Sequence, residues 1–139
     1  MRVRILVDTS ALVAILSRGD EHHKACVEQL HELVPPLFTC WPVITEAAWL
    51  LRDQPLAIEG LFDSFERGLL KVLLLDENAL GWIRAFLRRY RKLGAQLADA
   101  ALAYLAEREG IETVFTLDRR DFSVYRLRAK RSLNLLPPL

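Results

Sequence analysis

The sequence contains few of the residues that commonly form disulfides or bind transition metals, with two cysteines and three histidines among 139 residues. Cys26 and Cys40 have no C-x-x-C spacing, so we expect two buried, reduced thiols rather than a disulfide framework. His22, His23 and His31 fall in one predicted helix without an i,i+4 pair, which argues against a histidine metal site there.

The sequence also lacks an apolar run of membrane-spanning length. The longest apolar block, residues 69–75, is interrupted by Lys71, whereas a spanning helix needs roughly 20 apolar residues. Arg2 and Arg4 precede an apolar stretch, but Asp8 lies inside that stretch, which argues against a signal peptide. We find no repeat, low-complexity segment or linker, and we expect one cytoplasmic domain covering residues 1–139.

The composition that remains is typical of a folded globular domain, with 52% hydrophobic and 27% charged residues. Basic and acidic residues nearly balance, at 19 and 18, but their distribution is uneven. Acidic residues prevail in the first half of the chain and basic residues after residue 75. This asymmetry permits a polyanionic partner for the second half.

Short aliphatic runs alternate with longer helical patterns. The predicted strands are 3–7, 37–40, 69–75, 112–116 and a short 133–136. The predicted helices are 9–16, 20–33, 42–52, 55–67, 76–92 and 95–109, with Asp76 as a helix cap and a polar turn after residue 116. Helical crossovers between strands favour an α/β fold, with a parallel sheet of four or five strands and helices on both faces. Ligands of such sheets bind beyond the carboxyl ends of the strands, which Asp8 and Asp118 follow.

Three acids lie in apolar segments that contain no basic residue. Glu46 is the only charge in residues 41–51, Asp99 is the only charge in residues 93–106, and Asp8 stands alone in residues 5–16. Each acid by itself is explained as a helix cap or as the partner of a distant arginine. Together, and with Asp118 or Asp121 as a fourth, they predict a site for a hard cation such as Mg²⁺ or Mn²⁺, because unpaired buried carboxylates are costly.

An ordered set of motifs resembles the PIN-domain nucleases, and most closely the VapC-like ribonuclease toxins of toxin–antitoxin pairs. The set consists of Val-Asp8-Thr-Ser10-Ala-Leu after the first strand, Glu46 early in a helix, Leu-Ala-Asp99-Ala-Ala-Leu-Ala in a later helix, and Thr116-Leu-Asp118-Arg-Arg-Asp121-Phe after the next strand. The resemblance spans almost the whole chain, and the motifs occur in the usual order and spacing.

The resemblance implies a metal-dependent endoribonuclease that hydrolyses RNA phosphodiester bonds through a metal-activated water. Asp8, Glu46, Asp99 and Asp118 would be the catalytic residues and would surround one or two Mg²⁺ or Mn²⁺ ions. Asp121 would be auxiliary, and the hydroxyls of Ser10 and Thr116 would hold ligands or waters in place. The resemblance also implies a homodimer and a small cognate antitoxin that occupies the active groove.

Arginines of the second half are predicted RNA contacts. Arg84, Arg88 and Arg91 lie on one predicted helix, and Arg119 and Arg120 follow Asp118. Contacts with phosphates supply most sequence-independent affinity for nucleic acid. The alternative is that these side chains form a solvated basic face.

Other functions stay open at this point. An aspartyl-phosphate phosphatase would use Asp8 but requires a second acid two residues later, where Ser10 stands. A receiver domain requires an acceptor aspartate at the end of a middle strand, where Cys40 stands. The remaining alternatives are a PIN-like RNA-processing nuclease that is not a toxin, and a non-catalytic domain that binds RNA or a protein partner.

Overall fold

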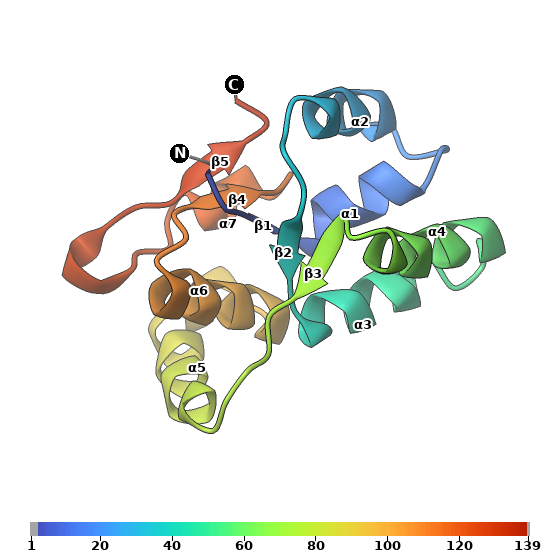
Figure 1. The fold of residues 1–139 in the computed structure, drawn as a ribbon. Helices are drawn as coiled ribbons and strands as arrows, with labels where there is room; N and C mark the ends of the chain where they lie inside the picture. The colour runs from blue at the N-terminus through green and yellow to red at the C-terminus, as the bar shows by residue number, and fades with distance from the viewer. Residues whose placement is uncertain (1–2, 139) are drawn as a thin grey trace.

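The fold is an α/β sandwich built on a parallel sheet. The computed structural model describes residues 3–138, which form one five-stranded sheet in the order β3-β2-β1-β4-β5 (Figure 1). The strands are β1 (Ile5–Val7), β2 (Leu37–Thr39), β3 (Leu70–Val72), β4 (Thr113–Phe115) and β5 (Asn134–Leu136). Every neighbouring pair is parallel. The predicted fold class is therefore confirmed, with the short fifth strand included.

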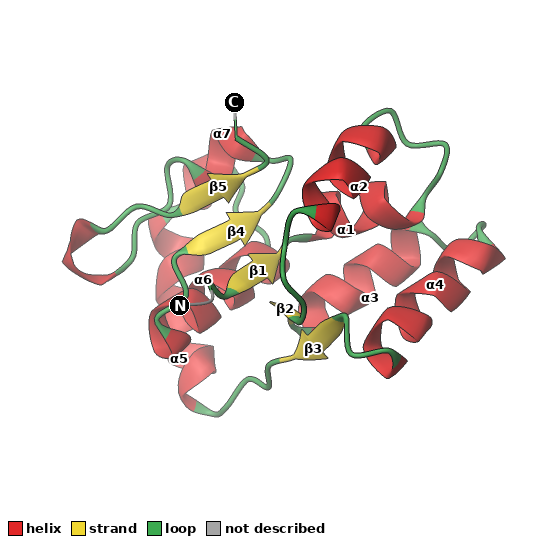
Figure 2. Cartoon of the chain, turned by 45° about the horizontal axis from the view of Figure 1, so that its top comes forward, coloured by secondary structure: helices red, strands yellow, loops and turns green. Residues whose placement is uncertain are grey.

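Helices cover both faces of this sheet. The helices are α1 (Thr9–Leu16), α2 (His23–His31), α3 (Trp41–Leu50), α4 (Pro55–Glu66), α5 (Asn78–Arg89), α6 (Leu97–Glu109) and α7 (Arg119–Phe122), with short 3-10 turns η1 (Arg91–Leu93) and η2 (Arg128–Lys130). α1 to α4 gather on one side of the sheet, and α5 and α6 pack together on the other (Figures 1 and 2). No helix in the described part of the chain is long and apolar enough to span a membrane.

The central strand β1 and its neighbour β4 are buried on both faces. β1 pairs with β2 through Leu6 and Phe38, and with β4 through Leu6 and Val114. All three residues of β1 and all three of β4 are buried, as expected for strands that helices cover on both sides. Cys26 and Cys40 are buried and free, which confirms the predicted thiols.

The chain order reverses between β1 and β4. β2 and β3 extend the sheet from one side of β1, whereas β4 and β5 extend it from the other. Asp8 follows β1 directly, and the segment from Thr116 to Asp121 follows β4. Their side chains therefore meet at the carboxyl edge of the sheet, at the position where α/β folds commonly bind ligands.

Several predicted boundaries are too wide. The helix predicted for 20–33 begins only at His23, because the Asp20 carboxylate accepts the His22 amide at 2.8 Å and forms a turn. The strand predicted for 69–75 is paired only over Leu70–Val72. β3 is an edge strand, and its single partner β2 ends where α3 begins, so the ladder stops there.

Two further predictions differ in part from the structure, namely the bounds of the helix after Asp76 and the turn after β4. Glu77, not Asp76, occupies the N-cap position of α5, and the predicted helix 76–92 ends at Arg89 before η1. The Asp76 carboxylate still accepts the amide of Asn78, the first residue of α5, at 2.9 Å, and it also binds Tyr104 Oη at 2.7 Å and Arg108 Nη1 at 3.0 Å. The predicted polar turn contains the helix α7, because Asp118 Oδ1 accepts the Asp121 amide at 3.3 Å and caps it.

Candidate functional site

Asp8 is the most deeply buried acid at the carboxyl edge, with 4% of its surface exposed. Its Oδ2 accepts hydrogen bonds from Thr116 Oγ1 at 2.7 Å and from Ser10 Oγ at 3.2 Å. Burial raises the pKa of Asp8 to about 6, and the negative charge of Asp99 acts in the same direction. The Thr116 hydrogen bond opposes this shift, so the carboxylate is costly to ionise but is held by hydroxyl donors.

The hydroxyls of Ser10 and Thr116 connect the ends of β1 and β4. Besides donating to Asp8, Thr116 Oγ1 accepts the Asp118 amide at 3.0 Å. Ser10 Oγ accepts the Leu117 amide at 2.9 Å. Both hydroxyls therefore fix the orientation of Asp8 relative to the loop that carries Asp118, which is a positioning role.

Asp99 approaches from the first turn of α6. It forms a capping box with Gln96, in which the side chains of the two residues bond each other's backbone amides. Its Oδ2 also accepts the Tyr125 hydroxyl at 2.8 Å. Burial raises the pKa of Asp99, and the charges of Asp118 and Glu46 add to the shift, although the Tyr125 and Gln96 hydrogen bonds oppose it.

Tyr125 is a site residue that the sequence did not indicate. Its side chain is fully buried among the rings of Phe86, Tyr90 and Phe122, whose centroids lie 4.9, 5.0 and 5.1 Å from the Tyr125 ring. This aromatic cluster joins α5 to the segment after α7 and aims the hydroxyl at Asp99. No local pattern marks such a contact, because the two residues are 26 positions apart.

Asp118 and Asp121 are presented by α7. Asp118 is the N-cap of that helix, and burial raises its pKa, with the charge of Asp121 acting in the same direction. Asp121 is 8% exposed, and its Oδ1 accepts Arg120 Nε at 3.0 Å. Arg120 itself is largely exposed, so solvent weakens this ion pair.

Glu46 comes from the middle of α3. Its side chain is half-buried, and no hydrogen bond or ion pair engages its carboxylate among residues 3–138. Of the predicted site acids, it is the least constrained by the surrounding protein.

All five acids line one pocket of about 200 Å³. Its walls are Asp8, Thr9, Ser10, Glu46, Leu50, Gly94, Gln96, Asp99, Asp118 and Asp121. One carboxylate oxygen from each of Asp99, Asp118 and Asp121 lies within 4.8 Å of the other two. Asp121, an alternative fourth acid by its position and an auxiliary residue by the resemblance, thus belongs to this group together with the predicted ligands Asp99 and Asp118.

This donor set fits a hard divalent cation. The acids supply only oxygen ligands, which Mg²⁺ and Mn²⁺ prefer, and neither the histidines nor the two thiols line the pocket. Burial raises the pKa values of Asp8, Asp99 and Asp118, and the charges of neighbouring acids add to the shift; a bound cation would offset that repulsion.

The predicted RNA-contacting arginines fall into two groups. Arg84, Arg88 and Arg91 are exposed on α5 and η1, close in sequence to the pocket residue Gly94. Arg119 Nη1 donates to the backbone oxygen of Pro137, and Arg120 pairs with Asp121. The first three are therefore free to contact a polyanion, whereas the last two are engaged within the protein.

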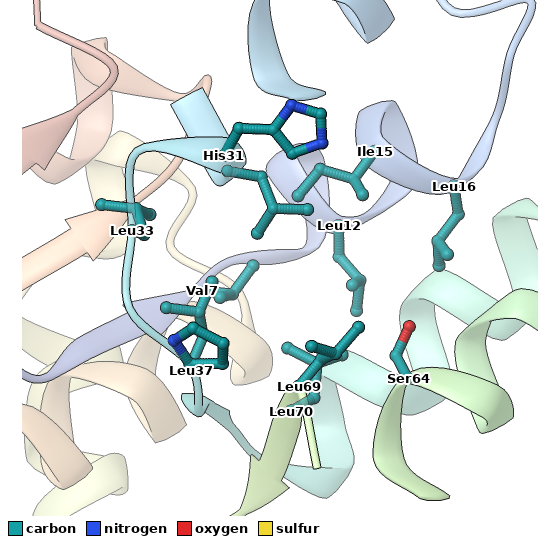
Figure 3. A pocket seen from close by; sticks show the side chains of 12 residues that line it. Val7, Leu12, Ile15, Leu16, His31, Leu33, Leu37, Ser64, Leu69 and Leu70 are labelled. Carbon is teal, nitrogen blue, oxygen red and sulfur yellow. The ribbon is translucent and has the colours of Figure 1, made fainter. Parts of the chain in front are cut away.

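A second pocket, of about 350 Å³, is apolar (Figure 3). Leu12 and Leu16 of α1 face Leu37 and Leu70 of the sheet across it. Among the described residues no carboxylate lines this pocket, so it offers no acidic ligands for a cation. The acids that the sequence predicts line the acidic pocket instead.

Comparisons with known proteins agree with this fold. Residues 5–127 match the PIN domain family model. The chain is 27% identical over 127 residues to the protein named Ribonuclease VapC26 of Mycobacterium tuberculosis, covering 88% of this chain and 92% of that protein.

Two solved structures are also similar. VapC20 of Mycobacterium tuberculosis, described as a sarcin-ricin loop cleaving toxin, superposes with a TM-score of 0.75 at 20% identity, over 83% of this chain and 90% of that chain. PAE2754 of Pyrobaculum aerophilum superposes with a TM-score of 0.56 at 22% identity, over 97% and 90%. By its sequence match and its fold, the chain belongs to the PIN domain family and is a distant relative of the VapC ribonuclease toxins.

Proposed function

We propose that this protein is an endoribonuclease that depends on Mg²⁺ or Mn²⁺ and acts as the toxin of a toxin–antitoxin pair. The observation that carries the proposal is the group of carboxylate oxygens of Asp99, Asp118 and Asp121 within 4.8 Å of one another. Asp8 and Glu46 line the same pocket, at the edge of the sheet where α/β folds bind ligands. The relationship to a protein named as a ribonuclease supports RNA as the substrate.

Asp8, Glu46, Asp99 and Asp118 are the proposed ligands, with Asp121 as a further acid of the same pocket. Bound Mg²⁺ or Mn²⁺ would supply the positive charge that activates a water and neutralises the phosphodiester during in-line attack. The protein's own part is positioning. Thr116 and Ser10 hold Asp8, and the Tyr125 hydroxyl holds Asp99.

The exposed arginines of α5 and η1 would bind the RNA backbone. Arg84 and Arg88 of α5 and Arg91 of η1 lie on the chain shortly before Gly94, which lines the pocket. Salt-dependent contact with phosphates would hold the RNA across the acidic pocket, whose own charge repels an anion. Arg119 and Arg120 would contribute less, because each is engaged within the protein.

A second copy of the chain and a small antitoxin are the proposed protein partners. Large apolar side chains are exposed on α3, α4 and α5, namely Trp41, Trp49, Leu56, Phe62 and Leu80. Protein interfaces commonly cover apolar surface of this kind. Sedimentation of the purified chain tests whether it forms a dimer. Growth of cells that express the chain with and without the gene that precedes it in the genome tests whether that gene encodes the antitoxin.

The test of the nuclease is cleavage of an end-labelled structured RNA. We expect cleavage in Mg²⁺ or Mn²⁺, none in excess EDTA, and recovery when the metal is restored. Asp118→Asn should abolish cleavage, and Asp63→Asn, an exposed acid on α4, should not. Undiminished cleavage in EDTA would remove the metal from the mechanism.

The toxin role has its own readout. Expression of the wild-type chain should arrest growth, and expression of Asp8→Asn should not. Cleavage of RNA by the purified protein without any effect of expression on growth would favour the RNA-processing alternative.

A further inference from the structure

Thr9 carries a buried hydroxyl that the surrounding protein leaves unused. It is the first residue of α1, it lines the acidic pocket, and 3% of its surface is exposed. Its Oγ1 is the one buried side-chain oxygen or nitrogen atom of residues 3–138 that has no hydrogen-bond partner. Burying a hydroxyl without a partner opposes folding, so such an atom on a residue that lines a pocket points to a ligand.

The other hydroxyls near Thr9 all have hydrogen-bond partners. Thr116 and Ser10 both donate to Asp8 and both accept backbone amides. Thr39, which is fully buried one strand away, donates to the backbone oxygen of Val7 at 3.1 Å. Carboxylates line the pocket around Thr9, yet none of them accepts its proton. The Thr9 hydroxyl is therefore the buried donor of this pocket that remains free for a bound molecule.

We propose that the Thr9 hydroxyl donates a hydrogen bond to a non-bridging oxygen of the RNA phosphate in the pocket. The proposal rests on the proposed ribonuclease function and assigns a substrate contact within that site. The acids of the pocket can accept hydrogen bonds but cannot donate them when ionised, so a phosphate there needs a donor from elsewhere. Ser10 cannot supply it without releasing Asp8.

Three variants separate this contact from a structural role. Thr9→Val removes the hydroxyl and keeps the shape, and Thr9→Ser restores a hydroxyl. Thr39→Val is the matched control, because it removes a buried hydroxyl that has a partner and lies outside the pocket. In EDTA, Thr9→Val should melt at the wild-type temperature or higher, whereas Thr39→Val should melt lower.

Two measurements then identify the ligand. Calorimetric titration with Mn²⁺ in the absence of RNA should give Thr9→Val the wild-type affinity. With RNA and Mg²⁺, kcat/KM of Thr9→Val should fall about tenfold or more, as expected for loss of a hydrogen bond to a charged group. Thr9→Ser should recover most of that loss, and Thr39→Val should keep the wild-type value.

Three results would overturn the assignment. An unchanged kcat/KM in Thr9→Val, beside an active wild type, would show that the hydroxyl does not touch substrate. Weaker Mn²⁺ binding in proportion to the lost activity would place the hydroxyl in the hydration shell of the cation. A lower melting temperature in EDTA, restored by Thr9→Ser, would show a structural partner. Failure of the wild type itself to cleave RNA is a different outcome, which removes the ribonuclease proposal and this contact with it.

Discussion

The Tyr125 hydroxyl donates a hydrogen bond of 2.8 Å to Asp99 Oδ2, and this bond links a fully buried aromatic cluster to the acidic pocket. This hydrogen bond lowers the pKa of Asp99 and so favours its ionised form. Burial and the charges of the neighbouring acids act in the opposite direction. Burial raises the pKa of Tyr125, and the hydrogen bond to Asp99 adds to the shift, so this hydroxyl stays protonated and remains a donor.

Tyr125→Phe should therefore weaken the metal site. Loss of the donor removes the hydrogen bond that holds Asp99 and favours its ionised form, so Mn²⁺ affinity should fall several-fold. The variant should also lose about 1 to 3 kcal/mol of unfolding free energy. Calorimetry and urea denaturation measure the two effects. Tyr90→Phe is the control, since it removes a hydroxyl of the same cluster that binds the Arg126 amide instead. Equal Mn²⁺ affinities for the two variants would contradict the role given to Tyr125.

The stability of the metal-free protein should depend on pH through Asp8. Its pKa is about 6 in the folded protein against 3.8 as the ordinary value, so the folded state binds more protons between these values. Stability from this group is therefore present at low pH and is lost as pH rises through about 6. The unfolding free energy that Asp8 contributes should therefore be about 3 kcal/mol lower above pH 6 than below pH 3.8.

Asp8→Asn isolates that contribution. In EDTA, the unfolding free energy of the wild type should fall relative to that of Asp8→Asn as pH rises from 4 to about 7. Urea denaturation at several pH values measures the difference. A difference that stays constant across this range would mean that Asp8 is not destabilised by burial.

RNA products should carry 5′-phosphate and 3′-hydroxyl ends. Attack by the ribose 2′-oxygen needs a pair of groups for proton transfer, and histidine serves this role most often. None of the three histidines lines the acidic pocket; His31 lines the apolar pocket, and His23 Nδ1 is hydrogen-bonded to the backbone oxygen of Ala14 in α1. Chromatography of the cleaved ends, before and after phosphatase treatment, identifies them. A main product with a 2′,3′-cyclic phosphate would contradict the prediction.

Arg88→Ala combined with Arg91→Ala should weaken RNA binding and reduce its dependence on salt. For every phosphate that the variant no longer neutralises, the slope of log affinity against log salt should become shallower by up to about one unit. Fluorescence anisotropy with labelled RNA at several salt concentrations measures the slope. The control is Arg18→Ala with Arg67→Ala, which removes the same charge at the ends of α1 and α4. An unchanged slope in the first variant would assign Arg88 and Arg91 to a solvated face or to a protein interface.

The sequence predicted the parts of the site that depend on local contrast. Asp8 and Asp99 stood out because each is a lone charge in a segment too apolar to be exposed, and both line the pocket in the structure. The strand and helix order followed from the same apolar patterns. The exact bounds of the strands and helices could not be predicted in this way, because the length of an edge strand such as β3 depends on where its partner ends.

Contacts between distant segments were beyond sequence patterns. Asp121 joins the acidic group because α7 forms where a turn was predicted. Tyr125 reaches Asp99 because its ring packs against Phe86 of α5 and against Tyr90 at the end of that helix. The free hydroxyl of Thr9 is likewise a property of three-dimensional packing, since Ser10 beside it is fully engaged.

The central claim is that the acids of this pocket share a divalent cation, and the melting temperatures of the wild type and Asp99→Asn, each in EDTA and in Mg²⁺, test it most directly. Asn keeps the shape, can still accept the Tyr125 hydrogen bond, and removes one of several repelling charges. In EDTA the variant should therefore melt at the wild-type temperature or higher. Mg²⁺ should raise the melting temperature of the wild type and should raise that of the variant much less, since a tenfold loss of affinity removes about 1.4 kcal/mol of ligand stabilisation. A variant that melts several degrees lower in EDTA, or that gains as much from Mg²⁺ as the wild type, would contradict the shared site.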